Sequence, residues 1–206
     1  MAITYPLTFP THTGIASVRM RMIRASVLSM SPFTFAQQTL QHSGQRWEAD
    51  ISLPPMDKAR AKAWIGWLAS LNGYQGTFLM GDPDGALPMG TAGGTPLVNG
   101  AGQTGSTLTV DGASAGSTGW LLAGDYFQLG SGSTSTLHMV TQDADADGSG
   151  NVTLEIFPEI RTAPDDDAAL TVLNPKGLFR LNGPNTDWDV RSAAIYGLSF
   201  SAVEAI

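Results

Sequence analysis

The chain contains no cysteine among its 206 residues. The absence of thiols excludes a disulfide-stabilised scaffold, thiolate metal sites and cysteine nucleophiles. Charged residues make up only 14% of the chain, and the formal net charge of -7 argues against nucleic-acid binding through a broad basic surface. No apolar run reaches the ~18 residues of a membrane-spanning helix. The opening residues lack the basic region and apolar core of a signal peptide, which predicts synthesis and use without Sec-type export.

Glycine, by contrast, is abundant, with 24 residues, and 42% of the chain is hydrophobic. This composition favours a globular protein with many turns and short strands. The pattern changes twice: residues 86–175 consist of short strand-like segments separated by Gly, Ser, Thr and Asp, whereas longer alternating segments lie on either side. The sequence therefore predicts a mainly β protein with one α-helix. Residues 1–85 and 176–206 form an outer domain, which a small all-β barrel or sandwich at residues 86–175 interrupts.

Three segments of the outer domain alternate apolar and polar residues with the period of two that half-buried strands show: SVRMRMIR, RWEADISL and IYGLSFSA. In the first segment Arg19 and Arg21 lie on the polar face, and in the second Glu48 and Asp50 do. If these two strands are neighbours, the arginines can pair with the acids across the strands. We therefore expect both arginines to be paired with carboxylates.

A single amphipathic helix is predicted between Leu53 and Tyr74. Asp57 can cap its first turn, and Asn72–Gly73 supplies a left-handed stop. Between these signals, apolar residues recur at i, i+3, i+4 and i+7, at Ala61, Trp64, Ile65 and Leu68. We expect Trp64 and Leu68 to be buried against a sheet, whereas Trp67 fits either the core edge or an interface.

The segment DADADGSGN is the best candidate for a metal site, because Asp143, Asp145 and Asp147 match the first positions of a calcium-binding loop. The twelfth position, however, holds Leu154, and the carboxylate of Glu155 comes one residue late. Strands rather than helices flank the loop. Asp and Gly are also ordinary turn residues, so the segment predicts a connection between strands and no tight metal site.

Other segments resemble catalytic motifs without their context. GAGQTG at residues 100–105 matches a dinucleotide-binding pattern, but a strand follows it where a helix is required. GASAG around Ser114 resembles a nucleophile elbow, yet no helix follows. Residues 81–96 are rich in turn dipeptides and predict a linker into the inserted module. The histidines are scattered, at His12, His42 and His138. No enzyme activity and no cofactor are therefore expected.

The inserted module offers one alternative function. Trp120, Tyr126 and Phe127 are candidates for stacking on host-surface glycans, as small β modules can do. Core packing is the other interpretation of these aromatic residues in a strand-rich module.

The order of these parts resembles a known family. The phrases WEADISLPPMDKARAKAWIGWLASLNGYQGTFLMGDP, GDYFQLG, NVTLEIFPEIRTAP, NPKGLFRL and YGLSFSAVEA together look like the distal tail protein of long, flexible-tailed bacteriophages. The likeness extends from about residue 40 to the end of the chain. It lies in the order of elements and phrases and includes no catalytic signature.

The resemblance implies a tail-tube-like β-sandwich domain, six copies of which form a ring around the DNA channel. It also implies contacts with the tail tube protein and the hub or tip proteins, assembly in the host cytoplasm and a place at the tail tip of the virion. In such a ring Arg19, Arg21, Glu48 and Asp50 are candidates for the channel wall or a subunit interface. A tail tube or terminator subunit and a glycan-binding adhesin remain alternatives.

Overall fold

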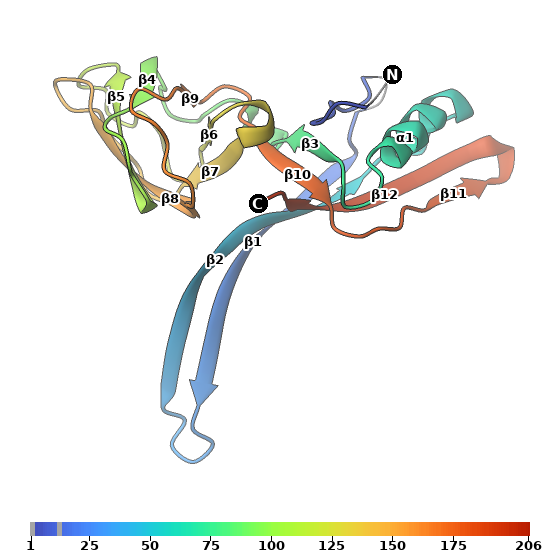
Figure 1. Ribbon diagram of the computed structural model, residues 1–206, viewed down its shortest axis with the longest axis horizontal. Helices are drawn as coiled ribbons and strands as arrows, with labels where there is room; N and C mark the ends of the chain where they lie inside the picture. Colours follow the sequence, from blue (N-terminus) through green and yellow to red (C-terminus); the bar gives the residue numbers. More distant parts are fainter. Residues whose placement is uncertain (1–2, 12–13) are drawn as a thin grey trace.

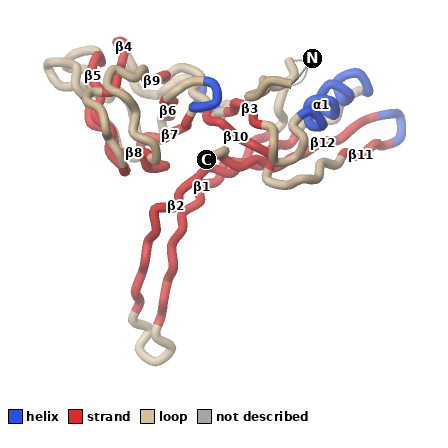
Figure 2. Tube along the Cα trace, viewed as in Figure 1, coloured by secondary structure: helices blue, strands red, loops and turns tan. Residues whose placement is uncertain are grey.

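The computed structural model describes residues 3–11 and 14–206. Its two antiparallel sheets and single α-helix confirm the mainly β fold class (Figures 1 and 2). The described residues also form three short 3₁₀ helices, at Asp84–Ala86, Gly132–Thr134 and Ser192–Ala194. The described part of the chain has no helix long and apolar enough to cross a membrane.

The larger sheet, called here the outer sheet, has the strand order β1-β2-β12-β10-β3, and β11 pairs with the first half of β12. Its strands are β1 (Ser17–Met30), β2 (Gln37–Ser52), β3 (Thr77–Met80), β10 (Gly177–Leu181), β11 (Trp188–Arg191) and β12 (Ile195–Glu204). The three alternating segments lie in β1, β2 and β12, which are neighbours. Their apolar positions in β2 and β12 are buried as predicted, at Trp47, Ala49, Ile51, Tyr196, Leu198, Phe200 and Ala202.

The smaller sheet curls into a barrel with the strand order β4-β5-β8-β7-β6-β9. Its strands are β4 (Gly94–Val98), β5 (Gly105–Ala113), β6 (Tyr126–Leu129), β7 (Thr136–Val140), β8 (Val152–Ile160) and β9 (Leu170–Thr171). A bridge between Leu97 and Ala169 nearly closes it. Strand β4 corrects the prediction of a linker over residues 81–96, because Gly94 already belongs to the barrel. The pairing of β4 with the segment before β9 is a single bridge, from Leu97 to Ala169, and is too short to predict from local composition.

The chain leaves and re-enters the outer sheet at adjoining positions. Strands β3 and β10 are paired, and Met80 lies opposite Gly177 in their register. The barrel is therefore inserted between two neighbouring strands of one sheet. This arrangement lets the outer sheet form from both ends of the chain without a long connection across its surface.

The helix α1 (Lys58–Ser70) begins and ends at the signals in its sequence. The backbone N–H of Arg60 donates to the Asp57 carboxylate at 3.0 Å, which satisfies one of the free amides of the first turn. After the last turn, Asn72 and Gly73 adopt positive φ values of 50° and 63°. These left-handed residues end the helix and turn the chain toward β3.

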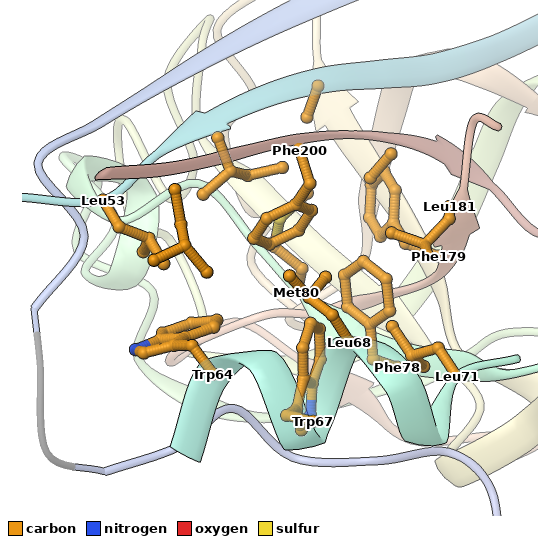
Figure 3. Close-up of a cluster of buried hydrophobic side chains, with 14 of the residues drawn as sticks. Leu53, Trp64, Trp67, Leu68, Leu71, Phe78, Met80, Phe179, Leu181 and Phe200 are labelled. Carbon is orange, nitrogen blue, oxygen red and sulfur yellow. The ribbon is translucent and has the colours of Figure 1, made fainter. Parts of the chain in front are cut away.

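Helix α1 covers one face of the outer sheet and forms an aromatic core with it (Figure 3). Trp64 and Leu68 are 0% and 3% exposed, which confirms their predicted burial. Trp67 belongs to the core as well: its ring centroid lies 5.1 Å from that of Phe78, and its indole N–H donates to the Thr8 carbonyl at 2.8 Å. The core-edge interpretation of Trp67 is therefore the correct one.

The barrel shares this core rather than hanging from a flexible tether. Leu137 and Phe157 of the barrel are buried in the same cluster as the outer sheet. Trp47 of β2 packs edge-on against Phe157, with ring centroids 5.1 Å apart, and its indole N–H donates to the Leu137 carbonyl at 2.9 Å. The guanidinium of Arg24 lies 4.7 Å from the centre of the Phe157 ring. The two sheets are therefore packed together as one body.

Truncating the helix stripe tests this core. Trp64→Ala and Leu68→Ala should each lower the free energy of unfolding by about 2–5 kcal/mol, because each leaves a cavity under α1. Denaturant unfolding measures the change. The matched control is Lys62→Ala on the exposed side of the same helix, which should change stability by less than about 0.5 kcal/mol. Changes below about 1 kcal/mol for both core variants would contradict the packing of α1.

Removing the barrel tests the domain organisation. Deletion of residues 91–174, with a short Gly/Ser linker joining the ends, should leave an outer domain that still melts cooperatively, because β3 and β10 adjoin. Its melting temperature should fall, since Trp47 loses its barrel contacts. Circular dichroism and calorimetry measure both properties. A broad transition without a calorimetric peak would mean that the outer domain does not fold without the barrel.

Candidate assembly surfaces

The four charged residues singled out in the sequence lie on the face of the outer sheet opposite α1. In the register of β1 and β2, Arg19 faces Asp50 and Arg21 faces Glu48, so the predicted side-by-side placement is confirmed. The Arg21 guanidinium donates two hydrogen bonds to Asp50, at 2.7 and 3.2 Å, and lies 3.7 Å from Glu48. Arg46 forms a further ion pair with Glu48 at 2.7 Å.

Only one of the two arginines is paired as predicted. Among the described residues, Arg19 makes no ion pair, although its positive charge acts on the neighbouring carboxylate of Asp50. The Ser201 hydroxyl, which donates to Asp50 at 2.6 Å, and the positive charge of Arg21 hold the pKa of Asp50 below its usual range. Within one copy, Asp50 therefore stays ionised and turns toward Arg21, which leaves Arg19 available to another molecule or to solvent.

The most unusual surface is a long two-stranded hairpin that leaves the body of the molecule. Beyond Arg24 and before Gln45, β1 and β2 run away from both the barrel and α1 (Figures 1 and 2). We call residues 25–44 the arm. Apart from Ser31, which is half-buried, every residue of the arm is exposed.

The composition of the arm is that of an interface and not that of a solvated surface. It contains no Asp, Glu, Lys or Arg. Six large apolar side chains of the arm are between 51% and 92% exposed, at Val27, Leu28, Met30, Phe33, Phe35 and Leu40. Native proteins normally protect open strand edges with charges or proline, and an isolated two-stranded ribbon is at best marginally stable in water. The arm is therefore the strongest candidate for a contact with another molecule.

The sequence pattern does not predict this arm, because the regular alternation of SVRMRMIR breaks down after Arg24, in the segment ASVLSM. The available signal was the complete absence of charge between Arg24 and Arg46 in a region with strand-like composition. The turn SPFTFA at residues 31–36, which holds a proline and two phenylalanines, marks the end of the hairpin. Exposure itself could not be read from the sequence, since a buried strand has the same residue types.

The acidic loop at residues 141–151 connects β7 to β8 and also holds a neighbouring loop in place. Asp143 accepts a hydrogen bond from the backbone N–H of Ala123 at 2.9 Å. Asp145 accepts one from the backbone N–H of Gly119 at 2.6 Å. Each carboxylate thus satisfies an amide of the loop between β5 and β6, and the two side chains point at different amides.

Asp and Ala alternate in this loop because one side of it packs on the barrel core and the other side bonds the neighbouring loop. Ala144 and Ala146 are buried in the barrel, 5% and 6% exposed. Asp147 closes the turn: the side-chain amide of Asn151 donates to it at 2.9 Å, and this bond, with backbone N–H groups of Asn151 and Ser149, holds the pKa of Asp147 below its usual range. No group of three or more acidic or histidine residues in the described chain is placed to hold a metal ion.

Burial contradicts the stacking role considered for two of the three barrel aromatics. Trp120 and Phe127 are each 0% exposed, so neither ring can face a glycan. The Trp120 indole N–H donates to the Gly93 carbonyl at 2.8 Å and anchors the segment that precedes β4. Tyr126 is half-buried against Trp47, with ring centroids 5.9 Å apart. These aromatic residues hold the barrel and its junction together.

The segments that resemble catalytic motifs lie in barrel turns. Residues 100–105 lead into β5, and Ser114 follows the same strand in a turn. His42 lies in the arm, and His138 is bonded within the barrel, so neither is placed as a base for this serine. His12 lies outside the described residues.

His138 is a buried histidine, and its hydrogen bonds determine which ring nitrogen carries the proton. Its Nδ1–H donates to the Pro158 carbonyl at 2.8 Å, because a carbonyl can only accept, and its Nε2 then accepts from the Thr136 hydroxyl at 3.0 Å. The ring stacks on Phe127, with centroids 5.4 Å apart. Burial lowers the pKa of His138 to about 4, so the imidazole is neutral at physiological pH.

Two charged side chains, Glu204 and Arg161, complete the junction between barrel and outer sheet. Glu204, which is buried, forms an ion pair with Arg161 from the end of the barrel and accepts the backbone N–H of Trp47 at 3.0 Å. Arg161 also donates to the Gln45 carbonyl at 2.7 Å. These bonds satisfy the polar groups that the junction buries, so the barrel is held in one orientation beside the foot of the arm.

Comparison with known proteins gives no further indication of function. No protein-family model matches the sequence, and no curated protein matches it. The function must therefore be inferred from the arm, the charged face and the junction, together with the resemblance in the sequence.

The buried histidine predicts a pH dependence of stability. The unfolded chain binds a proton on His138 below about pH 6.5, whereas the folded protein binds it only near pH 4, where its lowered pKa lies. Stability should therefore fall as pH drops from 6.5 toward 4, by roughly 3 kcal/mol from this residue, and should be independent of His138 above pH 6.5. Urea unfolding of wild type and His138→Gln measures the difference, which should shrink toward low pH. An unchanged difference across this range would contradict the assignment.

Proposed function

We propose that the protein is a structural subunit of a bacteriophage tail, and that copies of it form a ring at the distal end of the tail tube. The ring joins the tube to the tail tip or baseplate and surrounds the DNA channel, and its stoichiometry by resemblance is six. The observation that carries the proposal is the arm, an uncharged ribbon that exposes six large apolar side chains and has no partner within its own described chain.

The energetics of the arm favour assembly over solvation. Burying a large apolar side chain stabilises a complex by about 1.5–3 kcal/mol, and the arm exposes six of them. A standard interface contributes roughly 20–30 residues from each side, which is the size of this segment. A contact that joins unlike surfaces of identical copies closes a ring when the rotation between copies is right. The arm supplies the surface that such a contact needs.

The charged face of the outer sheet suits the wall of a channel. DNA that passes a row of unpaired arginines would bind them and be slowed, because each neutralised phosphate adds a salt-dependent attraction. Arg21 is held by Asp50 and Glu48, so it presents little free positive charge. Arg19 alone has no acid of its own among the described residues. We expect a carboxylate of a neighbouring copy to pair with it in the ring.

The rigid junction supports a scaffold and not an adhesin. A barrel held in one orientation can present a fixed surface to tail tube and hub proteins. The glycan-binding alternative loses its two largest candidate rings, since Trp120 and Phe127 are buried. A tail tube or terminator subunit stays an alternative within the same class, and it differs in the assembly that it forms: tube subunits stack into long tubes, whereas a tail-tip ring stays single.

Native mass spectrometry and negative-stain microscopy of the purified chain test the proposal. Wild type should form single rings. An arm-less variant, in which Asn-Gly replaces residues 27–40 and closes the hairpin at the partners Ser26 and Gln41, should stay monomeric with an unchanged barrel and α1. The control is Leu87→Ser with Met89→Ser, which removes exposed apolar side chains outside the arm and should still form rings.

Two outcomes contradict this function. If wild type stays monomeric at the highest attainable concentration, or if the arm-less variant assembles as well as wild type, the arm is not the ring contact. Long tubes instead of single rings would favour the tube subunit.

A further inference from the structure

A pair of adjoining cavities lies where the foot of the arm, the end of the barrel and the C-terminal residues meet. Their volumes are about 510 and 760 Å³, and they share the wall residues Glu159, Ile160, Arg161 and Ile206. We call this space the junction cavity. Figure 1 shows the C-terminus between β8 and the point where the arm leaves the body.

The walls of the junction cavity are suited to an apolar, uncharged occupant. Ile23 lines it from β1 just before the arm, Ala25 from the foot of the arm, Ile160 from the barrel and Ile206 from the C-terminal end. The two arginines in its walls are already neutralised within the chain, Arg161 by Glu204 and Arg46 by Glu48. The two acids in its walls, Glu159 and Asp165, make no ion pair among the described residues. An anionic ligand would therefore find no unpaired cation there, whereas uncharged apolar side chains would replace water at low cost.

The tip of the arm has the complementary chemistry. Phe33 and Phe35 are 92% and 69% exposed, and no charged residue lies near them in the sequence. The tip is also shaped in advance: the Ser31 side chain accepts the backbone N–H groups of Phe33 and Thr34, each at 3.4 Å, and Phe35 has a φ of 55°. A preformed turn that presents two phenyl rings loses little entropy on binding.

We propose that the arm tip of one copy inserts Phe33 and Phe35 into the junction cavity of a second copy. The tip cannot reach the cavity of its own chain, because residues 37–44 alone extend it by roughly 25 Å at about 3.3 Å per strand residue. Both halves of the contact are present in every copy, which is the condition for a head-to-tail assembly. Cavities of about 300–1,000 Å³ enclose ligands larger than two phenyl rings, so the space is sufficient.

This contact rests on the proposed ring and adds its acceptor site. It predicts that the ring contact involves the barrel of the next copy as well as its sheet, since Ile160 and Arg161 belong to the barrel end. The arm tip would then also hold the neighbour's barrel in place.

Cross-linking tests the contact directly, because the chain has no cysteine of its own. Differently tagged Phe35→Cys and Ile206→Cys proteins are mixed and treated with a short bismaleimide. A covalent heterodimer should form in at least tenfold greater yield than with the control partner Met89→Cys, whose position on the barrel is equally exposed. Equal yields, or no cross-linked product, would overturn the contact.

Assembly measurements separate this contact from the ring itself. Phe33→Ser with Phe35→Ser, and Ile206→Arg in the cavity, should each raise the concentration for half-assembly about tenfold or more, as loss of a central anchor does. A mixture of the two variants should form heterodimers, since one intact tip and one intact cavity remain. If wild type forms rings and either variant does so equally well, the contact is wrong while the ring stands. If the cross-link forms but wild type makes no ring, the contact stands and the ring is wrong.

Discussion

The arrangement of the molecule depends on the packing of Trp47 at the junction of its two sheets. The indole is buried, its N–H is bonded to the Leu137 carbonyl, and its ring lies edge-on against Phe157. Its backbone N–H is held by Glu204, which is buried and pairs with Arg161. A buried carboxylate without these partners would cost several kcal/mol, so the bonds and the packing are favourable only together. This coupling turns an inserted barrel into a fixed part of the structure.

The same junction determines where the arm begins. On the body side of Gln45, one face of β2 packs into the core that it shares with α1, β12 and the barrel. Toward the tip of the hairpin, every residue of both strands is exposed. Apolar residues therefore change role along a single hairpin. In the covered part they form the core, and in the arm residues of the same type are exposed. A two-stranded ribbon of this kind is stable when another molecule covers it, and the proposed function therefore rests on the arm.

Local patterns predicted the covered parts well. The cap at Asp57 fixes where α1 begins. The stripe through Trp64 and Leu68 and the alternation in β2 and β12 place apolar side chains on one side of a regular element, and the period alone identifies that side. The acidic loop connects β7 to β8, as its turn residues predict. The hydrogen bonds from Asp143 and Asp145 to the loop between β5 and β6 were not predictable, since they join segments distant in sequence.

The sequence by itself determined which face of each helix or strand is apolar and where the helix starts and stops. It also determined that β1 carries arginines and β2 carries acids on their polar faces. Only the tertiary structure decided that Arg21 takes both acids and leaves Arg19 without one, that Trp120 and Phe127 are buried, and that the arm is exposed. The physical reason is the range of the interactions. Periodicity and capping act within a few residues, whereas burial and ion pairing depend on which distant segments cover a surface.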